Sequence, residues 1–130
     1  MLHLDDGWVA AGDQQVLLPP ADRAFLAWFV RRAQSGLPGL PCPPEGEPSV
    51  EHARAYLAEY RRIRVDDDHP AQRYRLGMGK AGFLERKSKL NAALVAALGA
   101  AAANPYLIIG EGRRPMQYRL TLPKEALRFV

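Results

Sequence analysis

Residues 83–122 read FLERKSKLNAALVAALGAAAANPYLIIGEGRRPMQYRLTL, and this stretch decides the fold. Apolar side chains recur in its first part at helical spacing, which predicts a helix over residues 80–98. The β-prone run Tyr106-Leu107-Ile108-Ile109 follows, and after a loop rich in glycine and arginine the chain returns as Gln117-Tyr118-Arg119-Leu120-Thr121-Leu122. We therefore predict a hairpin over residues 105–122.

The preceding residues are predicted to form a strand meander and two further helices. Three short β-prone pieces are separated by the turn signals Asp6-Gly7 and Gly12-Asp13. Pro19-Pro20 favours a helix start, because proline's missing N–H costs nothing in a first turn. Ser49 is a suitable N-cap for the next helix. The predicted elements are a strand meander (1–18), helices (19–35, 49–65 and 80–98), a Pro-rich loop (36–48) and a wing hairpin (105–122).

These elements predict a single α+β domain over residues 1–130, with a core around the aromatic side chains of the first helix. A chain of 130 residues is long enough for one domain with its own core. Phe25, Trp28 and Phe29 lie at helical spacing and are expected in that core. A helix followed by a basic-tipped hairpin is the pattern of a winged helix-turn-helix domain, in which the hairpin is the wing. The last residues, from Pro123 to Leu127, are predicted to add one closing helical turn.

The composition is typical of a soluble globular protein, with 48% hydrophobic and 25% charged residues. No apolar run approaches the roughly 18–20 residues that a membrane span requires, so we expect no membrane partner. The first residues are acidic and do not resemble a secretory signal. Cys42 is the single cysteine, which favours a reducing, cytoplasmic location.

Charge is distributed unevenly along the chain, although the net charge is only +4. Residues 1–68 carry 7 Lys and Arg against 11 Asp and Glu, whereas residues 69–130 carry 11 against 3. This asymmetry indicates an anionic partner for the second half. The alternative is that the acidic half compensates the basic half at an internal contact.

The helix predicted over residues 80–98 has two distinct faces when successive residues are turned by about 100°. Its buried face is predicted to hold Phe83, Leu90, Leu94, Ala97 and Leu98. Its outward face collects Glu85, Ser88, Lys89, Ala92 and Ala96, with Arg86 on one margin. Lys87 falls within the apolar stripe, so its ammonium is expected to reach the surface along its aliphatic stem. Asn91 points towards the buried side.

The basic residues of this helix and hairpin predict contacts with nucleic-acid phosphates. Arginine side chains match phosphate oxygens, and a wing commonly supplies such contacts. The outward face lacks the Arg, Asn or Gln side chains that read base edges, so duplex DNA is expected to be bound through its backbone. The predicted nucleic-acid-binding residues are Lys80, Arg86, Ser88, Lys89, Arg113, Arg114 and Arg119.

The outward face also supports a second hypothesis, a protein-interaction or dimerisation module that does not bind nucleic acid. Ala92 and Ala96 are small, and small residues allow two helices to approach closely. A homodimer that pairs these faces is the corresponding prediction.

Signals for catalysis, metals and cofactors are weak. Asp66-Asp67-Asp68-His69 lacks the alternating spacing and the glycine of a hard-cation loop and is predicted to be a solvated acidic loop. Gly77-Met78-Gly79 lacks the lysine and serine of a phosphate-binding loop and is read as a flexible lead into the helix. No serine, cysteine or histidine stands in a recognisable nucleophile motif. We expect no enzyme activity, no metal and no cofactor.

Two families share features with this sequence. The order of strand meander, Leu17-Leu18-Pro19-Pro20, three helices and final hairpin resembles the OmpR-type winged-helix domain over nearly the full chain. That resemblance implies that the third helix enters the major groove and that the wing contacts the adjacent backbone. Two features depart from a simple helix-turn-helix motif: the inserted loop 36–48, and the long connection 66–79, where such a motif uses a turn of about three or four residues.

Residues 83–122 are also similar to the C-terminal winged-helix portion of CRISPR-associated proteins with a cyclic-oligoadenylate-sensing or ring-nuclease domain. The similar segments are Ser88-Lys89-Leu90-Asn91-Ala92-Ala93-Leu94, Leu98-Gly99, Pro105-Tyr106-Leu107-Ile108, Gly112-Arg113-Arg114-Pro115 and Tyr118-Arg119-Leu120. The similarity implies a role in antiviral defence, as an accessory module or a standalone relative. The nucleotide chemistry of such proteins belongs to an N-terminal α/β domain, for which this chain has no room.

Overall fold

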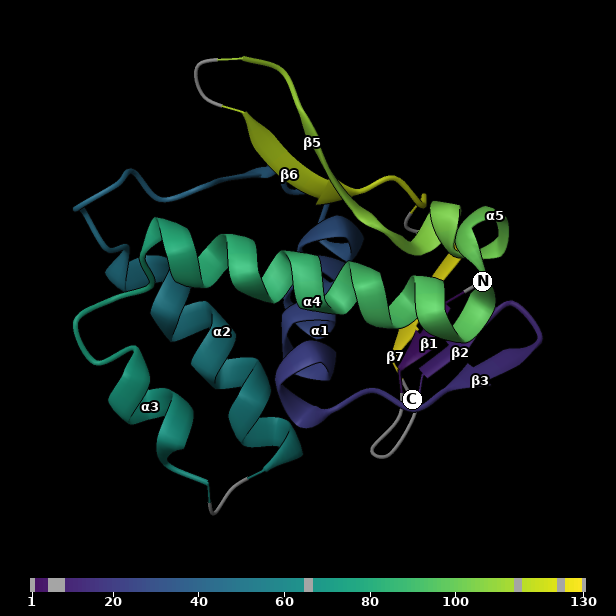
Figure 1. Ribbon diagram of the computed structural model, residues 1–130, viewed down its shortest axis with the longest axis horizontal. Helices are drawn as coiled ribbons and strands as arrows, with labels where there is room; N and C mark the ends of the chain where they lie inside the picture. Colours follow the sequence, from purple (N-terminus) through teal and green to yellow (C-terminus); the bar gives the residue numbers. More distant parts are fainter. Residues whose placement is uncertain (1, 5–8, 65–66, 114–115, 124–125, 130) are drawn as a thin grey trace.

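The computed structural model describes residues 2–4, 9–64, 67–113, 116–123 and 126–129. It has an α+β architecture in which helices α2 (Val50–Ile63) and α4 (Lys80–Leu98) pack against a central helix, α1 (Pro20–Gln34). Helix α4 crosses in front of α1, and a hairpin lies beside it (Figure 1). The three long helices therefore lie close to the ranges predicted from the sequence.

Shorter helical elements were not predicted. Helix α3 (His69–Arg73) occupies the connection between α2 and α4. Helix α5 (Ala100–Ala103) and a 3-10 turn (Asn104–Tyr106) connect α4 to the hairpin. Gly99 separates α4 from α5. Its φ of 84° is a conformation that glycine adopts easily and other residues rarely do, which explains why glycine stands at this helix end.

Helix α1 is the centre of the core. Every residue from Asp22 to Val30 is buried, so the helix is covered on all sides. The Phe25 ring lies 5.6 Å from that of Phe83 on α4 and 6.2 Å from that of Tyr56 on α2, centroid to centroid. Because aromatic pairs at these separations attract one another, this cluster holds the three long helices together. The aromatic side chains predicted for the core are therefore confirmed there.

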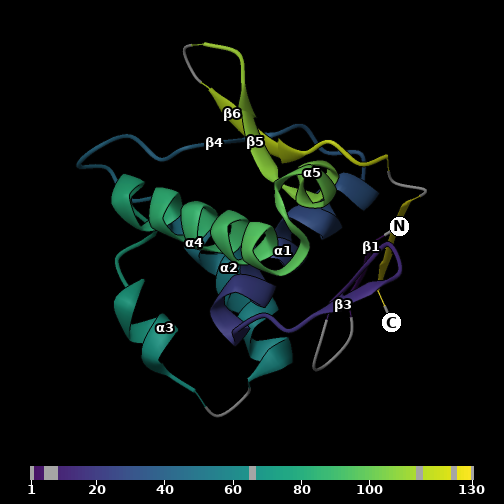
Figure 2. The ribbon, with the colours of Figure 1, turned by 45° about the vertical axis from the view of Figure 1, so that its right-hand side comes forward.

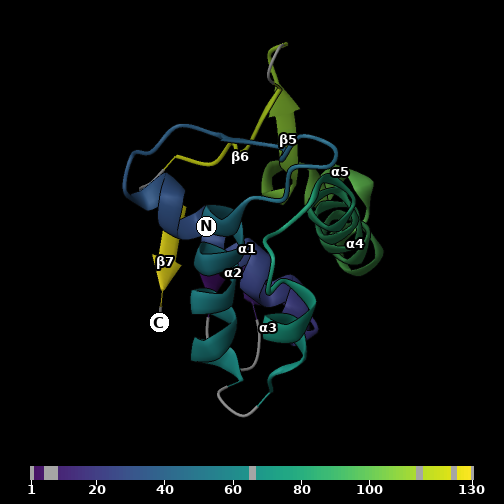
Figure 3. The same ribbon diagram turned by 90° about the vertical axis from the view of Figure 1, so that its left-hand side faces the viewer.

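A four-stranded sheet joins the two ends of the chain. Its strands are β1 (Leu2–Leu4), β2 (Val9–Ala11), β3 (Gln14–Val16) and β7 (Leu127–Phe129), in the order β3-β2-β1-β7. The predicted meander is antiparallel, and β7 adds to it parallel to β1. Figure 3 shows the two termini close together beside this sheet. One hydrogen bond of the predicted closing turn is present, from Ala126 N to the Pro123 carbonyl. Leu127, which was predicted to belong to that turn, instead begins strand β7.

The hairpin forms a second sheet with one strand from the Pro-rich loop. Its strands are β4 (Leu40–Pro41), β5 (Ile108–Glu111) and β6 (Gln117–Leu120), in the order β4-β6-β5. β4 pairs antiparallel with β6 at the edge of the sheet, a position that proline tolerates. Figure 2 shows the hairpin projecting beyond the helices. The segment predicted as a loop therefore pairs with the half of β6 that lies next to the hairpin loop.

The connection before α4 is held by backbone pairing. Ser49 N donates to the Met78 carbonyl at 2.8 Å, and Met78 N donates to the Ser49 carbonyl at 2.9 Å. Met78 is fully buried. This connection was predicted to be flexible, and the prediction did not foresee that the start of α2 would pair with it.

Replacing Gly77 with alanine should destabilise this junction by about 1–3 kcal/mol. Gly77 has φ of 113°, which L side chains rarely adopt, and an added Cβ would lie 3.0 Å from backbone carbons of Pro48 and Ser49. Gly79→Ala is the control, since Gly79 has φ of −86° and no heavy atom within 4 Å of an added Cβ. Thermal unfolding should show a clear loss in Tm for Gly77→Ala alone, and equal losses would contradict the proposed strain.

Candidate nucleic-acid interface

Helix α4 turns its apolar face to α1 as the helical period predicts. Phe83, Leu90 and Leu94 are fully buried, and Leu98 is half-buried. Ala97, predicted for the same face, is instead exposed. Lys80, Ser88, Lys89, Ala92 and Ala96 are all exposed.

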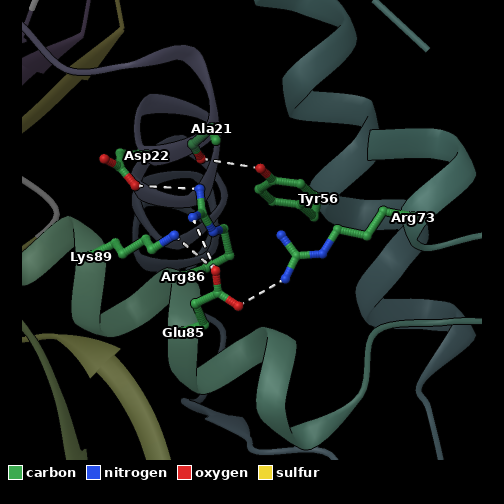
Figure 4. A network of polar contacts seen from close by, with 7 residues as sticks. All are labelled: Ala21, Asp22, Tyr56, Arg73, Glu85, Arg86 and Lys89. Atoms are coloured by element: carbon green, nitrogen blue, oxygen red, sulfur yellow. Dashed lines mark hydrogen bonds and ion pairs between the residues drawn. The ribbon is translucent and has the colours of Figure 1, made fainter. Parts of the chain in front are cut away.

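Arg86 differs from the expectation that it lies on the accessible margin of α4. Only 8% of the residue is exposed. Its Nη1 lies 3.6 Å from Asp22 Oδ1 on α1, and its Nη2 lies 3.8 Å from Glu85 Oε1 (Figure 4). The first turn of α1 therefore covers the guanidinium and supplies a carboxylate. As placed, Arg86 does not belong to the exposed basic surface.

Glu85 gathers several cations on the same flank of α4. Lys89 Nζ lies 2.9 Å from Glu85 Oε1, and Arg73 Nη2 donates to Glu85 Oε2 at 2.9 Å (Figure 4). These contacts, that of Lys89 first, lower the pKa of the Glu85 carboxyl to about 2. Lys89 is thus exposed but ion-paired. Exposed pairs of this kind contribute about 0–1 kcal/mol, so a phosphate could replace the carboxylate.

Lys80 and Lys87 mark the other flank of α4, which faces the hairpin. Lys87 Nζ lies 5.4 Å from the ring centroid of Tyr118 on β6, within cation–π range. Lys80 lies two turns earlier, on the same face of the helix as Lys87. Burial raises the pKa of the Cys42 thiol, and the positive charges of Lys80 and Lys87 act in the opposite direction. Both lysines therefore lie near Cys42, the residue that directly follows β4.

The arginines of the hairpin do not all face α4. Tyr118 points towards α4, where its ring lies 5.4 Å from that of Phe83. Because side chains alternate along a strand, Arg119 lies on the opposite face. Arg119 donates from Nε and Nη2 to the two carboxylate oxygens of Glu111, each at 3.0 Å, and this pairing raises its pKa. Arg113 is exposed near the tip, and Arg114 lies outside the described residues.

Asn91 positions the hairpin against α4. Its amide nitrogen donates to the Ile108 carbonyl at 2.9 Å, and its amide oxygen accepts from Ile108 N at 3.0 Å. Ile108 is the first residue of β5 and is 1% exposed, so its backbone N–H and C=O need partners within the protein. The Asn91 side chain supplies both partners. The sequence signal was an asparagine beside the apolar stripe, but the backbone that it binds could not be identified.

Asn91→Ala should lower the free energy of unfolding by about 1–3 kcal/mol, because it leaves two buried backbone groups of Ile108 without partners. Ser88→Ala, one turn earlier on the exposed face, is the control and should change stability by less than about 0.5 kcal/mol. Urea denaturation measures both. If the two variants were equally stable, Asn91 would not hold the hairpin.

The structure leaves a smaller set of accessible cations than the sequence predicted. We use the name α4–hairpin surface for Lys80, Lys87 and Lys89 of α4, with Ser88 between the two lysine flanks, together with Arg113 near the hairpin tip, which lines a hollow with Glu111 and Arg119. Arg86 is covered and Arg119 points to the opposite side. Lys87 was not predicted as a contact residue, although it falls within the apolar stripe and its ammonium was expected to reach the surface.

Other classes of site have little support among the described residues. In that part of the chain, no group of three or more His, Cys, Asp or Glu side chains is placed to hold a metal ion. Asp67, in the acidic segment, accepts hydrogen bonds from Tyr60 Oη at 2.7 Å and from His69 N at 3.1 Å. Among the described helices, none has the length and apolar character to cross a membrane.

Comparison with known proteins gives no relative from which to transfer a function. No protein-family model, curated protein or solved structure matches the chain.

Proposed function

We propose that this protein is a nucleic-acid-binding module of the winged-helix type that contacts the backbone of duplex DNA with its α4–hairpin surface. The observation that carries the proposal is the placement of Lys80 and Lys87 on the flank of α4 that faces the projecting hairpin. A helix and a hairpin side by side, both bearing exposed cations, can follow two neighbouring segments of a phosphate backbone. The order of elements agrees with the OmpR-type domain that the sequence resembles.

The same surface favours backbone contacts over base reading. The two α4 side chains best suited to base edges are occupied, since Arg86 is buried and Asn91 binds Ile108. The polar side chains that α4 still offers to a ligand are those of Lys80, Lys87, Lys89 and Ser88, beside exposed alanines. Lysine acts as a point charge on phosphates, and phosphate contacts carry no sequence information. We therefore expect affinity with little sequence preference.

A salt titration with a random-sequence duplex tests the proposal. If Lys80, Lys87, Lys89 and Arg113 each neutralise one phosphate, the slope of log K against log salt should be about −3 to −4. In Lys80→Ala/Lys87→Ala the slope should flatten by about 2, as measured by fluorescence anisotropy.

The matched control is Arg54→Ala/Arg61→Ala, which removes two exposed charges from α2. The control should keep the parent slope. Equal flattening in both variants would indicate attraction to net charge alone, and absence of binding at low salt would reject the proposal.

A second candidate function is a protein-interaction module, and the exposed apolar end of α4 favours it. Val95 is 36% exposed between the exposed Ala92 and Ala96. This face is compatible with a second copy of the chain packed against α4. Under this proposal the module would serve assembly in a CRISPR-associated ring-nuclease-type protein, in the cytoplasm, without nucleic acid.

Sedimentation velocity separates the two candidates. A dimer that uses this face should dissociate in Ala92→Glu/Ala96→Glu, because each substitution places an unpaired carboxylate in the contact. Ala81→Glu, at the exposed start of α4, is the control and should leave the dimer intact. A parent protein that is monomeric at high micromolar concentration would exclude this candidate.

A further inference from the structure

A hollow of about 170 Å³ lies between α1, α2, α3 and Arg86 of α4. Its walls include the tyrosines Tyr56, Tyr60 and Tyr74 and the charged residues Asp67, Arg73 and Arg86. Arg86 lies on the flank of α4 where Lys89 pairs with Glu85 (Figure 4). Lys87 instead lies 5.4 Å from the Tyr118 ring centroid, on the flank that faces the hairpin.

Two polar groups in this wall lack hydrogen-bond partners. Tyr74 Oη and Arg86 Nε are buried without a partner in the part of the chain that the structure describes. Tyr74 is 5% exposed and Arg86 8%. The ion pairs of Arg86, at 3.6 and 3.8 Å, are longer than the roughly 2.7–2.9 Å of a charged hydrogen bond. Native proteins rarely leave such buried donors unsatisfied.

The other polar groups of the wall are engaged, which defines what the hollow can accept. The Asp67 carboxylate already accepts from Tyr60 Oη, and Tyr56 Oη donates to the Ala21 carbonyl at 3.2 Å. The buried groups of the wall without a partner among the described residues are the Arg86 guanidinium Nε, which can only donate, and the Tyr74 hydroxyl, which can donate as well. A group rich in acceptors and negatively charged would satisfy both.

We propose that this hollow binds the phosphate or carboxylate group of a small molecule, with Arg86 and Tyr74 as its donors. The volume suits such a group, since a cavity of about 150 Å³ holds one benzene ring, whereas drug-sized ligands occupy about 300–1,000 Å³. Tyrosine rings on the walls offer apolar surface to a small substituent. The site is independent of the nucleic-acid function proposed above.

The test is an NMR titration of the ¹⁵N-labelled full chain with phenyl phosphate, benzoate and inorganic phosphate. Benzamide serves as the neutral probe. The Arg86 Nε–Hε signal should shift and saturate with a Kd of about 1 mM or tighter for at least one anion, and benzamide should leave it unchanged. The phosphate and carboxylate probes separate the two ligand chemistries.

Tyr74→Phe is the decisive variant. Because the hydroxyl has no hydrogen-bond partner among the described residues, its removal should leave Tm unchanged or higher. The affinity for the anion should nevertheless fall about five- to tenfold, the effect of one hydrogen bond. Lys80→Ala/Lys87→Ala is the matched control and should bind the anion with the parent affinity.

Three results would overturn the proposal. No saturable shift at Arg86 with any anion up to about 10 mM would mean that the hollow holds water only. Unchanged affinity in Tyr74→Phe would exclude the proposed donor pair. Loss of anion binding in Lys80→Ala/Lys87→Ala would place the anion on the α4–hairpin surface instead.

Discussion

Phe83 makes the contacts on which the rest of the structure depends. Its ring lies 5.6 Å from Phe25 on α1 and 5.4 Å from Tyr118 on β6, centroid to centroid. One side chain of α4 therefore joins the central helix to the hairpin. The orientation of α4, and with it the spacing between its lysines and the hairpin, is a consequence of core packing. The Phe83 contacts, together with the two hydrogen bonds between Asn91 and Ile108, hold α4 and the hairpin in a fixed relative position.

The parts of the fold that could be predicted are those with local causes. Pro20 and Gly99 stand at the ends of helices because of their own backbone preferences, and Ser49 accepts from His52 N at 3.1 Å as an N-cap should. Strands β4 and β7 were missed because they are short and have distant partners. Nothing near Leu127 in the sequence indicates that it pairs with Leu2.

The candidate site could be predicted to a similar extent. The helical period is enough to place Ser88, Lys89 and Ala92 outward. The period fails for Arg86, since its exposure depends on what covers a long side chain, and that cover is the first turn of α1 with Asp22. The same limit applies to Arg119, whose carboxylate partner lies on the neighbouring strand. The charge totals indicated a basic second half of the chain, but they could not show which of its cations form ion pairs with its few carboxylates.

The parallel contact between β1 and β7 has a kinetic consequence. It closes a loop that comprises nearly the whole chain, whereas β1–β2 and β2–β3 close only short turns. Loop-closure entropy rises with the length of the loop, so this pairing should form only after the helices have condensed. In the native state β7 should be the first strand to open, and its amides should exchange with solvent deuterium faster than those of α1.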